Sequence, residues 1–238
     1  RPSQSSPTPE PMTTPAPEST ARQLLLVRHG RTPWNAIERA QGHTDVQLDE
    51  CGEEQSLAAA RVLALYEPVR LWCSDLARAR QTASYIETAT GLTAAVDPRL
   101  REYDVGVRSG LTRLEFAERF PEEYAAWRAG TGSPLVPGEE TTDSVRTRIT
   151  AALDECFDAL APGETGVVVA HGAAMKVGIL ALLGWDWSQA RGLRGMDNGA
   201  WAVLERDAQH PWTRLTAYSL LPKRRGHQPD FASCEGVG

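Results

Sequence analysis

Two histidines each follow a short apolar run and are each followed by a glycine. His29 comes after the run Leu24–Val27, with Arg28 between them, and His171 comes directly after Val167–Ala170. Runs of this kind are typical of strands that are buried on both faces of a parallel sheet. Because ligands of open α/β sheets bind beyond the carboxyl ends of the strands, we expect both histidines to face one pocket.

Such junctions suit the binding of an anion, because the N-terminus of a helix that follows a strand offers unpaired backbone N–H groups. The glycine after each histidine lets a substrate approach the backbone closely. A single histidine after a strand is more often a turn or core residue, and this alternative applies most to His171. His29 is the stronger candidate, because Arg28 precedes it and neither residue serves an apolar core.

Strands that alternate with helices predict an α/β fold, a single domain of three α/β/α layers around a mostly parallel sheet. Further strands are expected at residues 70–73, 94–96, 200–205 and 213–218. One helix is expected after Gly52, with Leu57, Ala60, Leu63 and Ala64 on one face, and another runs from a cap at Ser74 or Asp75 to about Ala89. A third begins at a capping box formed by Thr112 and Glu115. Further helices are expected over residues 145–160, where apolar residues repeat with the helical period, and after His171.

Length and composition support one domain and exclude several classes of partner. The 238 residues, 41% of them hydrophobic, are enough for one sizeable core. The net charge of −6 disfavours a nucleic-acid partner. No stretch approaches the roughly 20 apolar residues of a membrane span. Residues 1–22, rich in Pro, Ser and Thr, and residues 223–238 are expected to be flexible tails, which leaves a domain at 23–222.

The four cysteines, Cys51, Cys73, Cys156 and Cys234, form no CxxC pair, so no zinc or redox motif is expected. An even number allows two disulfides, but we favour free thiols and a cytoplasmic location. No cluster of metal-ligand residue types is visible, so neither a metal nor another cofactor is expected. The oligomer to test for is a homodimer.

Several segments resemble motifs of the histidine phosphatase superfamily. Residues 28–35 are similar to its RHG(E/Q)TxWN signature, and residues 74–83 are similar to its SDLxRAxQTA motif. Residues 100–106, 137–141 and 169–172 resemble its LREx(D/x)xG, PxGES and VxHG elements, in the same order. The resemblance implies a fold like that of phosphoglycerate mutases. The sequence departs from the family pattern at Arg108, Glu139 and Gln47, which stand where Trp, Gly and Pro are frequent.

The resemblance implies a role for each matching residue. It makes His29 the nucleophile, places Arg28 and Arg78 around the phosphate, and has His171 stabilise the transferring phosphoryl group. Glu102 is then the general acid, with Asp104 as its competitor. Residues matched to substrate binding are Asn35, Gln41, Gly42 and Gly172. Spacing alone leaves other interpretations open: Arg78 as a surface helix charge, Asn35 as a turn residue, and Glu102 as a loop carboxylate paired with Arg99 or Arg101.

The implied function is hydrolysis of a small phosphate monoester, a phosphosugar or phosphoglycerate, through a phosphohistidine. A cofactor-dependent phosphoglycerate mutase is the alternative. Mutases of the family usually carry ERHYG at the glutamate motif and a pair of arginines before the PxGES element. Here Glu102 is followed by YDVG, and Arg128 is the single arginine between Pro121 and Pro137. A non-catalytic binding module is the second alternative. Residues 195–201 resemble those of actinobacterial glucosyl-3-phosphoglycerate phosphatases.

Overall fold

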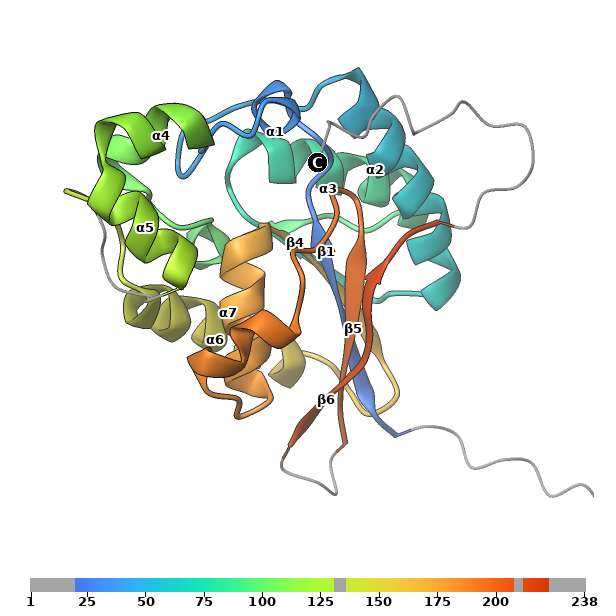
Figure 1. Ribbon diagram of the computed structural model, residues 1–238. Helices are drawn as coiled ribbons and strands as arrows, with labels where there is room; N and C mark the ends of the chain where they lie inside the picture. The colour runs from blue at the N-terminus through green and yellow to red at the C-terminus, as the bar shows by residue number, and fades with distance from the viewer. Residues whose placement is uncertain (1–19, 131–135, 208–211, 223–238) are drawn as a thin grey trace, which may run out of the picture.

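A six-stranded mixed sheet forms the centre of the computed structural model, which describes residues 20–130, 136–207 and 212–222 (Figure 1). Its strand order is β3-β2-β4-β1-β5-β6. Strands β3, β2, β4 and β1 run parallel, while β5 pairs antiparallel with β1 and with β6. The strands are β1 (Arg22–Arg28), β2 (Arg70–Cys73), β3 (Ala95–Val96), β4 (Thr165–Ala170), β5 (Trp201–Arg206) and β6 (Thr213–Leu220).

The central strands are buried on both faces, as their apolar runs predict. All six residues of β4 are buried, and the side chains of β1 alternate between two cores. Leu24 and Leu26 join the core under α6 (Thr142–Asp158) and α7 (Gly172–Leu182). Leu25 and Val27 join the core under α2 (Glu50–Leu63) and α3 (Ala77–Thr90). The predicted three-layer α/β/α fold is therefore confirmed (Figure 1).

Helix α2 buries only part of the predicted face. Ala60 and Leu63 are buried as expected, whereas Leu57 is 41% exposed and the unpredicted Ser56 and Ala59 are buried. The reason is contact with α3, which small residues allow at close range. Ser56 Oγ donates to the carbonyl of Gly52 at 2.7 Å and lies 3.2 Å from Thr82 Oγ1 of α3. A polar residue, Ser56, therefore shares the buried face with Ala60 and Leu63, and a count of apolar residues misassigns Leu57.

The predicted cap of α3 is wrong, because neither Ser74 nor Asp75 is its N-cap residue. The N-cap is Leu76, which makes no side-chain cap bond. The amide of Ala77 instead donates to Asp45 Oδ1 at 2.6 Å, and Asp75 forms an ion pair with Arg101. A residue 32 positions away in sequence thus caps the helix, which no local pattern reveals.

Two helices stand apart from the sheet, at the same end of the molecule as α1 (Pro33–Ala36) (Figure 1). They are α4 (Arg113–Arg119), which begins at the predicted capping box of Thr112 and Glu115, and α5 (Pro121–Ala129). Phe116 is the buried residue of α4, and α5 has none. The 3-10 helices are η1 (Ala64–Tyr66), η2 (Pro98–Leu100), η3 (Gly106–Arg108) and η4 (Trp187–Gly192).

The cysteines do not share one state. Cys73 and Cys156 are free and buried, and burial raises the pKa of their thiols to about 11 and about 12. Cys51 is disulfide-bonded, so the expectation of free thiols is wrong at that position. The reason is spatial, because pairing depends on the distance between cysteines in the fold and not on their spacing in sequence.

The expected tails, 1–22 and 223–238, lie outside the described residues except for 20–22, and β1 already begins at Arg22. The boundaries of the domain stay a prediction. Among the residues that the structure describes, none of the helices has the length and the apolar character needed to cross a membrane.

Candidate active site

The register of β1 and β4 brings the two histidines together. Arg28 lies opposite Ala170, and the backbone N–H of His29 donates to the carbonyl of Ala170 at 3.1 Å. Each histidine is the next residue after its strand, so their rings meet at the carboxyl edge of the sheet, with centroids 5.2 Å apart. Both are buried, with 3% exposure for His29 and none for His171.

The ring of His29 is held in one tautomer. Its Nδ1 lies 2.7 Å from the carbonyl oxygen of Gly30. Because a carbonyl only accepts hydrogen bonds, Nδ1 carries the proton and the lone pair is on Nε2. Burial, followed by the charges of Arg78 and Arg28, holds the pKa of His29 well below its ordinary range. The imidazole is therefore neutral, as a nucleophile must be.

The turn after His29 is fixed by close packing. The amide of Gly30 donates to Thr82 Oγ1 at 3.0 Å, which ties the turn to α3. A Cβ atom at Gly30 would lie 2.2 Å from the carbonyl oxygen of Gly52, so any larger residue would displace α2. The carbonyl that orients His29 is thereby held in place. Thr82 contributes to the site although the sequence assigned it no role.

Arg28 presents a buried guanidinium to the same edge. Its Nη1 donates to the carbonyl of Met196, while its Nε is buried with no hydrogen-bond partner among the described residues. Burial lowers the pKa of Arg28, and Glu102 opposes that shift. A Cβ atom at Gly172 would lie 3.3 Å from this Nε, so glycine keeps the space beside it open. A buried donor without a partner is the kind of group that a bound anion satisfies.

Arg78 is a core residue rather than a surface helix charge. It is 1% exposed and donates to the carbonyls of Gly42 at 2.8 Å and Thr44 at 2.9 Å. Its Nε donates to Nδ1 of His171 at 3.3 Å. Burial lowers its pKa to about 10, so it stays charged near neutral pH. Gly42 has a φ of +51°, which a glycine adopts readily.

The contacts of His171 differ from the role that the resemblance implies. Since Nδ1 accepts from Arg78, the ring proton lies on Nε2, which donates to Ser74 Oγ at 2.9 Å. Burial and then the charge of Arg78 hold the pKa of His171 well below its ordinary range. Both ring nitrogens thus bond to protein groups, and a bond from His171 to a phosphoryl group requires one of these contacts to open.

The carboxylate of Glu102 lies at the N-terminus of α7, next to His171. Its Oε2 accepts from the amide of Ala173 at 3.0 Å, and its Oε1 accepts from Ala174 at 2.8 Å and from Tyr103 at 3.0 Å. Unpaired amides at a helix N-terminus are good donors to anions. The loop that carries Glu102 therefore places a carboxylate at the start of the helix that follows His171, where its charge acts on Arg28 and Arg78.

The other interpretations of Glu102 find no support in the ion pairs of its neighbours. Arg99 pairs with Asp97 and Glu155, and Arg101 pairs with Asp75. The side chain of the competing carboxylate Asp104 is 51% exposed, and its Oδ2 lies 3.8 Å from His43 Nδ1. The geometry favours Glu102 over Asp104 as the carboxylate of the site.

Asn35 and Gln41 border the same region. Asn35 Oδ1 accepts from the backbone of Thr32 at 3.1 Å and from Asn198 Nδ2 at 3.3 Å, so its amide nitrogen is the group suited to a phosphate oxygen. Asn198 also donates to the carbonyl of His29 at 3.0 Å and is a site residue without an assigned role in the sequence. Gln41 is 9% exposed, and its Oε1 is buried with no hydrogen-bond partner among the described residues.

Two residues that depart from the family pattern, Arg108 and Glu139, contact each other. Arg108 Nη2 lies 3.1 Å from Glu139 Oε1, and the side chains are only 13% and 7% exposed. The Arg108 guanidinium also lies over the rings of Phe116 and Trp127, 5.2 and 5.7 Å from their centroids. This contact joins α4 and α5 to the loop at residues 136–141. In the described ranges, no group of three or more His, Cys, Asp or Glu side chains could hold a metal ion.

Comparison with known proteins identifies the class. Residues 24–218 match the model of the histidine phosphatase superfamily, branch 1, so the chain belongs to this family. It is a phosphatase, a phosphoric monoester hydrolase.

The similar proteins include both phosphatases and a probable mutase. The glucosyl-3-phosphoglycerate phosphatase of Mycobacterium tuberculosis is 37% identical over 193 residues, which cover 77% of this chain and 85% of the relative. A probable phosphoglycerate mutase GpmB of Yersinia pestis is 38% identical over 176 residues, covering 72% and 80%. A solved mycobacterial glucosyl-3-phosphoglycerate phosphatase in complex with VO3 has a TM-score of 0.76 and 33% identity, covering 83% of this chain and 98% of that one.

Proposed function

We propose that this phosphatase transfers the phosphoryl group of a small phosphorylated metabolite to His29 and then to water. The observation that carries the proposal is the neutral ring of His29, whose Nε2 lone pair is set by the Nδ1 contact with Gly30, among the buried cations Arg28 and Arg78. Covalent catalysis splits one difficult displacement into two easier ones. Buried guanidinium groups stabilise the charge that develops on the phosphoryl oxygens.

In the first step, Nε2 of His29 attacks phosphorus and the bond from phosphorus to the alcohol oxygen breaks. Glu102, protonated in this step, donates its proton to the departing oxygen. Arg28 and Arg78 hold the phosphoryl oxygens, and the amide nitrogen of Asn35 donates to one of them. The alcohol leaves, and Glu102 becomes a carboxylate, the form that accepts the amides of α7.

In the second step, water attacks the phosphohistidine. The Glu102 carboxylate takes a proton from the water as the bond between phosphorus and Nε2 breaks. Inorganic phosphate is released, and both His29 and Glu102 return to their starting protonation states. We assign His171 to stabilising the phosphoryl group in both steps, after one of its contacts with Ser74 and Arg78 opens.

A phosphoglycerate-type substrate is the best supported class. The relatives named glucosyl-3-phosphoglycerate phosphatases support it, together with the likeness at residues 195–201. Gln41, Gly42 and Gly172 are the further residues that we place at the substrate. The second candidate is phosphoglycerate mutase, because the relatives named probable phosphoglycerate mutase GpmB are of similar identity.

One reaction separates hydrolysis from transfer. A mutase must hold the dephosphorylated product and exclude water until a second hydroxyl reaches the phosphohistidine. We would follow 2-phosphoglycerate, 3-phosphoglycerate, glucosyl-3-phosphoglycerate and free phosphate, with and without 2,3-bisphosphoglycerate. We expect phosphate release from the preferred substrate and little interconversion of the phosphoglycerates. Fast interconversion with little phosphate release would establish the mutase instead.

The remaining assignments concern the whole protein. We propose residues 23–222 as the catalytic domain, with no nucleic-acid partner, and we keep the homodimer and the cytoplasmic location as predictions. Fractionation of the native host tests the location, and sedimentation of the purified chain tests the dimer.

A further inference from the structure

One arginine outside the phosphate pocket holds the loop that carries Glu102. Arg148 Nη1 donates to the carbonyls of Arg99 at 2.8 Å and Arg101 at 2.6 Å, and its Nη2 donates to the carbonyl of Glu102 at 2.9 Å. Nε and Nη2 also donate to the two carboxylate oxygens of Glu140, each at 2.8 Å. All five hydrogen bonds come from one guanidinium that is only 18% exposed.

Glu140 completes this connection to the loop. Its backbone amide donates to the carbonyl of Asp104 at 2.8 Å, and its Oε2 accepts from the amide of Asp104 at 3.3 Å. His43 Nε2 donates to the carbonyl of Glu102 at 2.8 Å, the same oxygen that accepts from Arg148. Residues 101–104 belong to no helix or strand, so side chains such as these determine their position.

We infer that Arg148, clamped by Glu140, is a positioning residue for the general acid Glu102. The inference rests on the proposed function of Glu102. An acid must lie within hydrogen-bond distance of the oxygen that it protonates, and a displacement of about 1 Å is costly. The Arg148 guanidinium fixes the backbone on both sides of Glu102 and so keeps its carboxylate at the start of α7.

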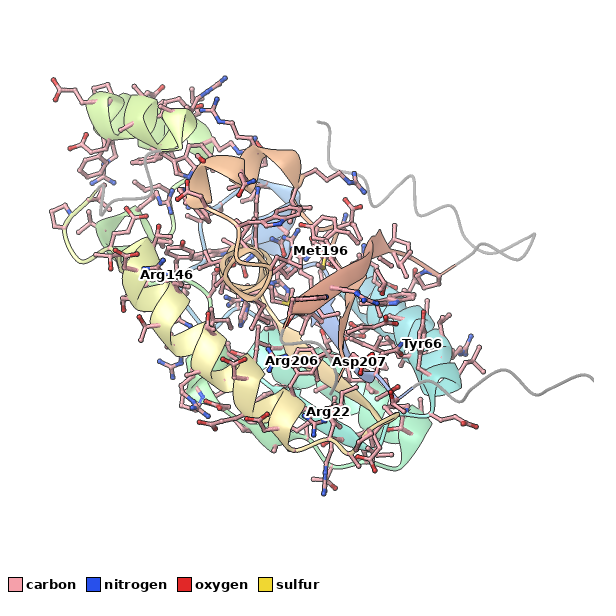
Figure 2. The ribbon with its side chains drawn as sticks, turned by 90° about the horizontal axis from the view of Figure 1, so that it is seen from below. Arg22, Tyr66, Arg146, Met196, Arg206 and Asp207 are labelled. Atoms are coloured by element: carbon pink, nitrogen blue, oxygen red, sulfur yellow. The ribbon has the colours of Figure 1, made fainter. Side chains whose placement is uncertain are left out.

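Two other arginines provide matched controls (Figure 2). Arg146, two residues earlier on α6, is 59% exposed and pairs with Asp143 on the same helix. Arg206 of β5 pairs with Asp154 near the other end of α6 and is 21% exposed, close to the exposure of Arg148. Arg146→Gln tests loss of a surface charge, and Arg206→Lys tests loss of a half-buried guanidinium.

The test compares phenyl phosphate with p-nitrophenyl phosphate, which differ in how much their leaving groups need a proton. Glu102→Gln should raise the ratio of kcat/KM for p-nitrophenyl phosphate to that for phenyl phosphate by about 10²-fold. Arg148→Lys should raise it about tenfold, because an ammonium cannot reproduce a planar fork of five bonds. Both controls should leave it unchanged. The ratio is independent of the fraction of folded enzyme.

Each outcome is decisive. Equal losses on both substrates in Arg148→Lys would show that Arg148 serves the fold alone and would overturn the inference. If Glu102→Gln itself leaves the ratio unchanged, Glu102 is not the acid, and the proposed function fails together with the inference. If Arg148→Lys does not fold, Glu140→Gln removes the charge of the clamp and must give the same rise in the ratio.

Discussion

The two sides of the active site are built differently. On the phosphate side, His29 and His171 directly follow adjacent parallel strands and are 0–3% exposed, and Arg78 comes from the helix after a third strand. On the leaving-group side, Glu102 lies on a loop, and α4 and α5 contribute only Phe116 to the buried residues. The sheet therefore fixes the groups that we propose bind and attack phosphate, while side-chain contacts fix the groups that we expect to meet the rest of the substrate.

This difference separates what the family shares from what varies in this chain. The motif residues His29, Arg78 and Glu102 stand where the family has them, whereas the departures Arg108 and Glu139 pair with each other on the leaving-group side. Replacing one member of such a pair alone would leave a buried charge, so the two departures depend on each other. We expect substrate selectivity to follow this side.

The largest effect should come from the phosphate side. His29→Ala should lower kcat by at least about 10⁴-fold, because the variant lacks the proposed nucleophile. The variant should stay folded, since His29 serves the site more than the core. Steady-state kinetics and a thermal melt measure both quantities. Residual turnover near that of the parent would move the nucleophile to another residue.

The next largest effect should come from the leaving-group side. It should lower local stability and leave turnover nearly unchanged. Arg108→Met removes the ion pair with Glu139 and the contact with Phe116 and Trp127. We expect local stability to fall by about 3 kcal/mol, seen as roughly 10²-fold faster amide exchange in α4 and α5. Turnover of p-nitrophenyl phosphate should stay within about threefold.

A matched control is Arg113→Met, which breaks an exposed pair with Glu38, with 59% and 46% exposure, and should change exchange very little. A 10²-fold loss of p-nitrophenyl phosphate turnover in Arg108→Met would mean that the two sides are not separable.

The pH dependence of stability should report the buried histidines. The pKa values of His29 and His171 are depressed in the fold and return to about 6.5 on unfolding. Below that pH the unfolded state binds more protons than the folded state. The free energy of unfolding therefore decreases as the pH is lowered, by about 1.4 kcal/mol per pH unit for each histidine. Above it the two add no pH dependence.

Urea unfolding between pH 5 and 8 tests this sign. His171→Asn should lower the slope below about pH 6.5 by the share of one histidine, while carboxylates contribute equally to variant and parent. Identical slopes would show that His171 is not held neutral in the fold.

The smallest effect expected is none. Because Arg28 and Arg78 supply positive charge at the phosphate, EDTA should leave kcat unchanged, while vanadate should inhibit as a mimic of five-coordinate phosphorus. Activity lost on chelation and restored by a divalent ion would contradict an arginine-only pocket.

The phosphate side could be predicted from sequence because its logic is local. An apolar run followed by histidine and glycine predicts both a buried strand and a histidine at its carboxyl end. Parallel pairing of two such strands then brings the two histidines together. Strands were also predicted at residues 70–73 and 213–218, where the structure has β2 and most of β6.

The rest depends on contacts between distant residues, which one sequence does not record. Arg148 reads as an ordinary helix charge, yet it reaches carbonyls 46 to 49 positions away. Asn198 meets Asn35 across 163 positions, and Asp45 caps α3 from another loop. The burial of Ser56 was not predicted, because its hydroxyl finds hydrogen-bond partners on α2 and α3 that one sequence does not reveal.

Trapping the phosphoenzyme tests the central claim most directly. Rapid quenching during turnover of a ³²P-labelled substrate, under alkaline conditions that preserve phosphohistidine, should give an acid-labile labelled protein. The labelled peptide should contain His29, and the phosphate should be on Nε2, because Nδ1 carries the proton bound to Gly30. His29→Ala should give no label, and Glu102→Gln should still give it with p-nitrophenyl phosphate. Label on Nδ1, or on any other residue, would contradict the account.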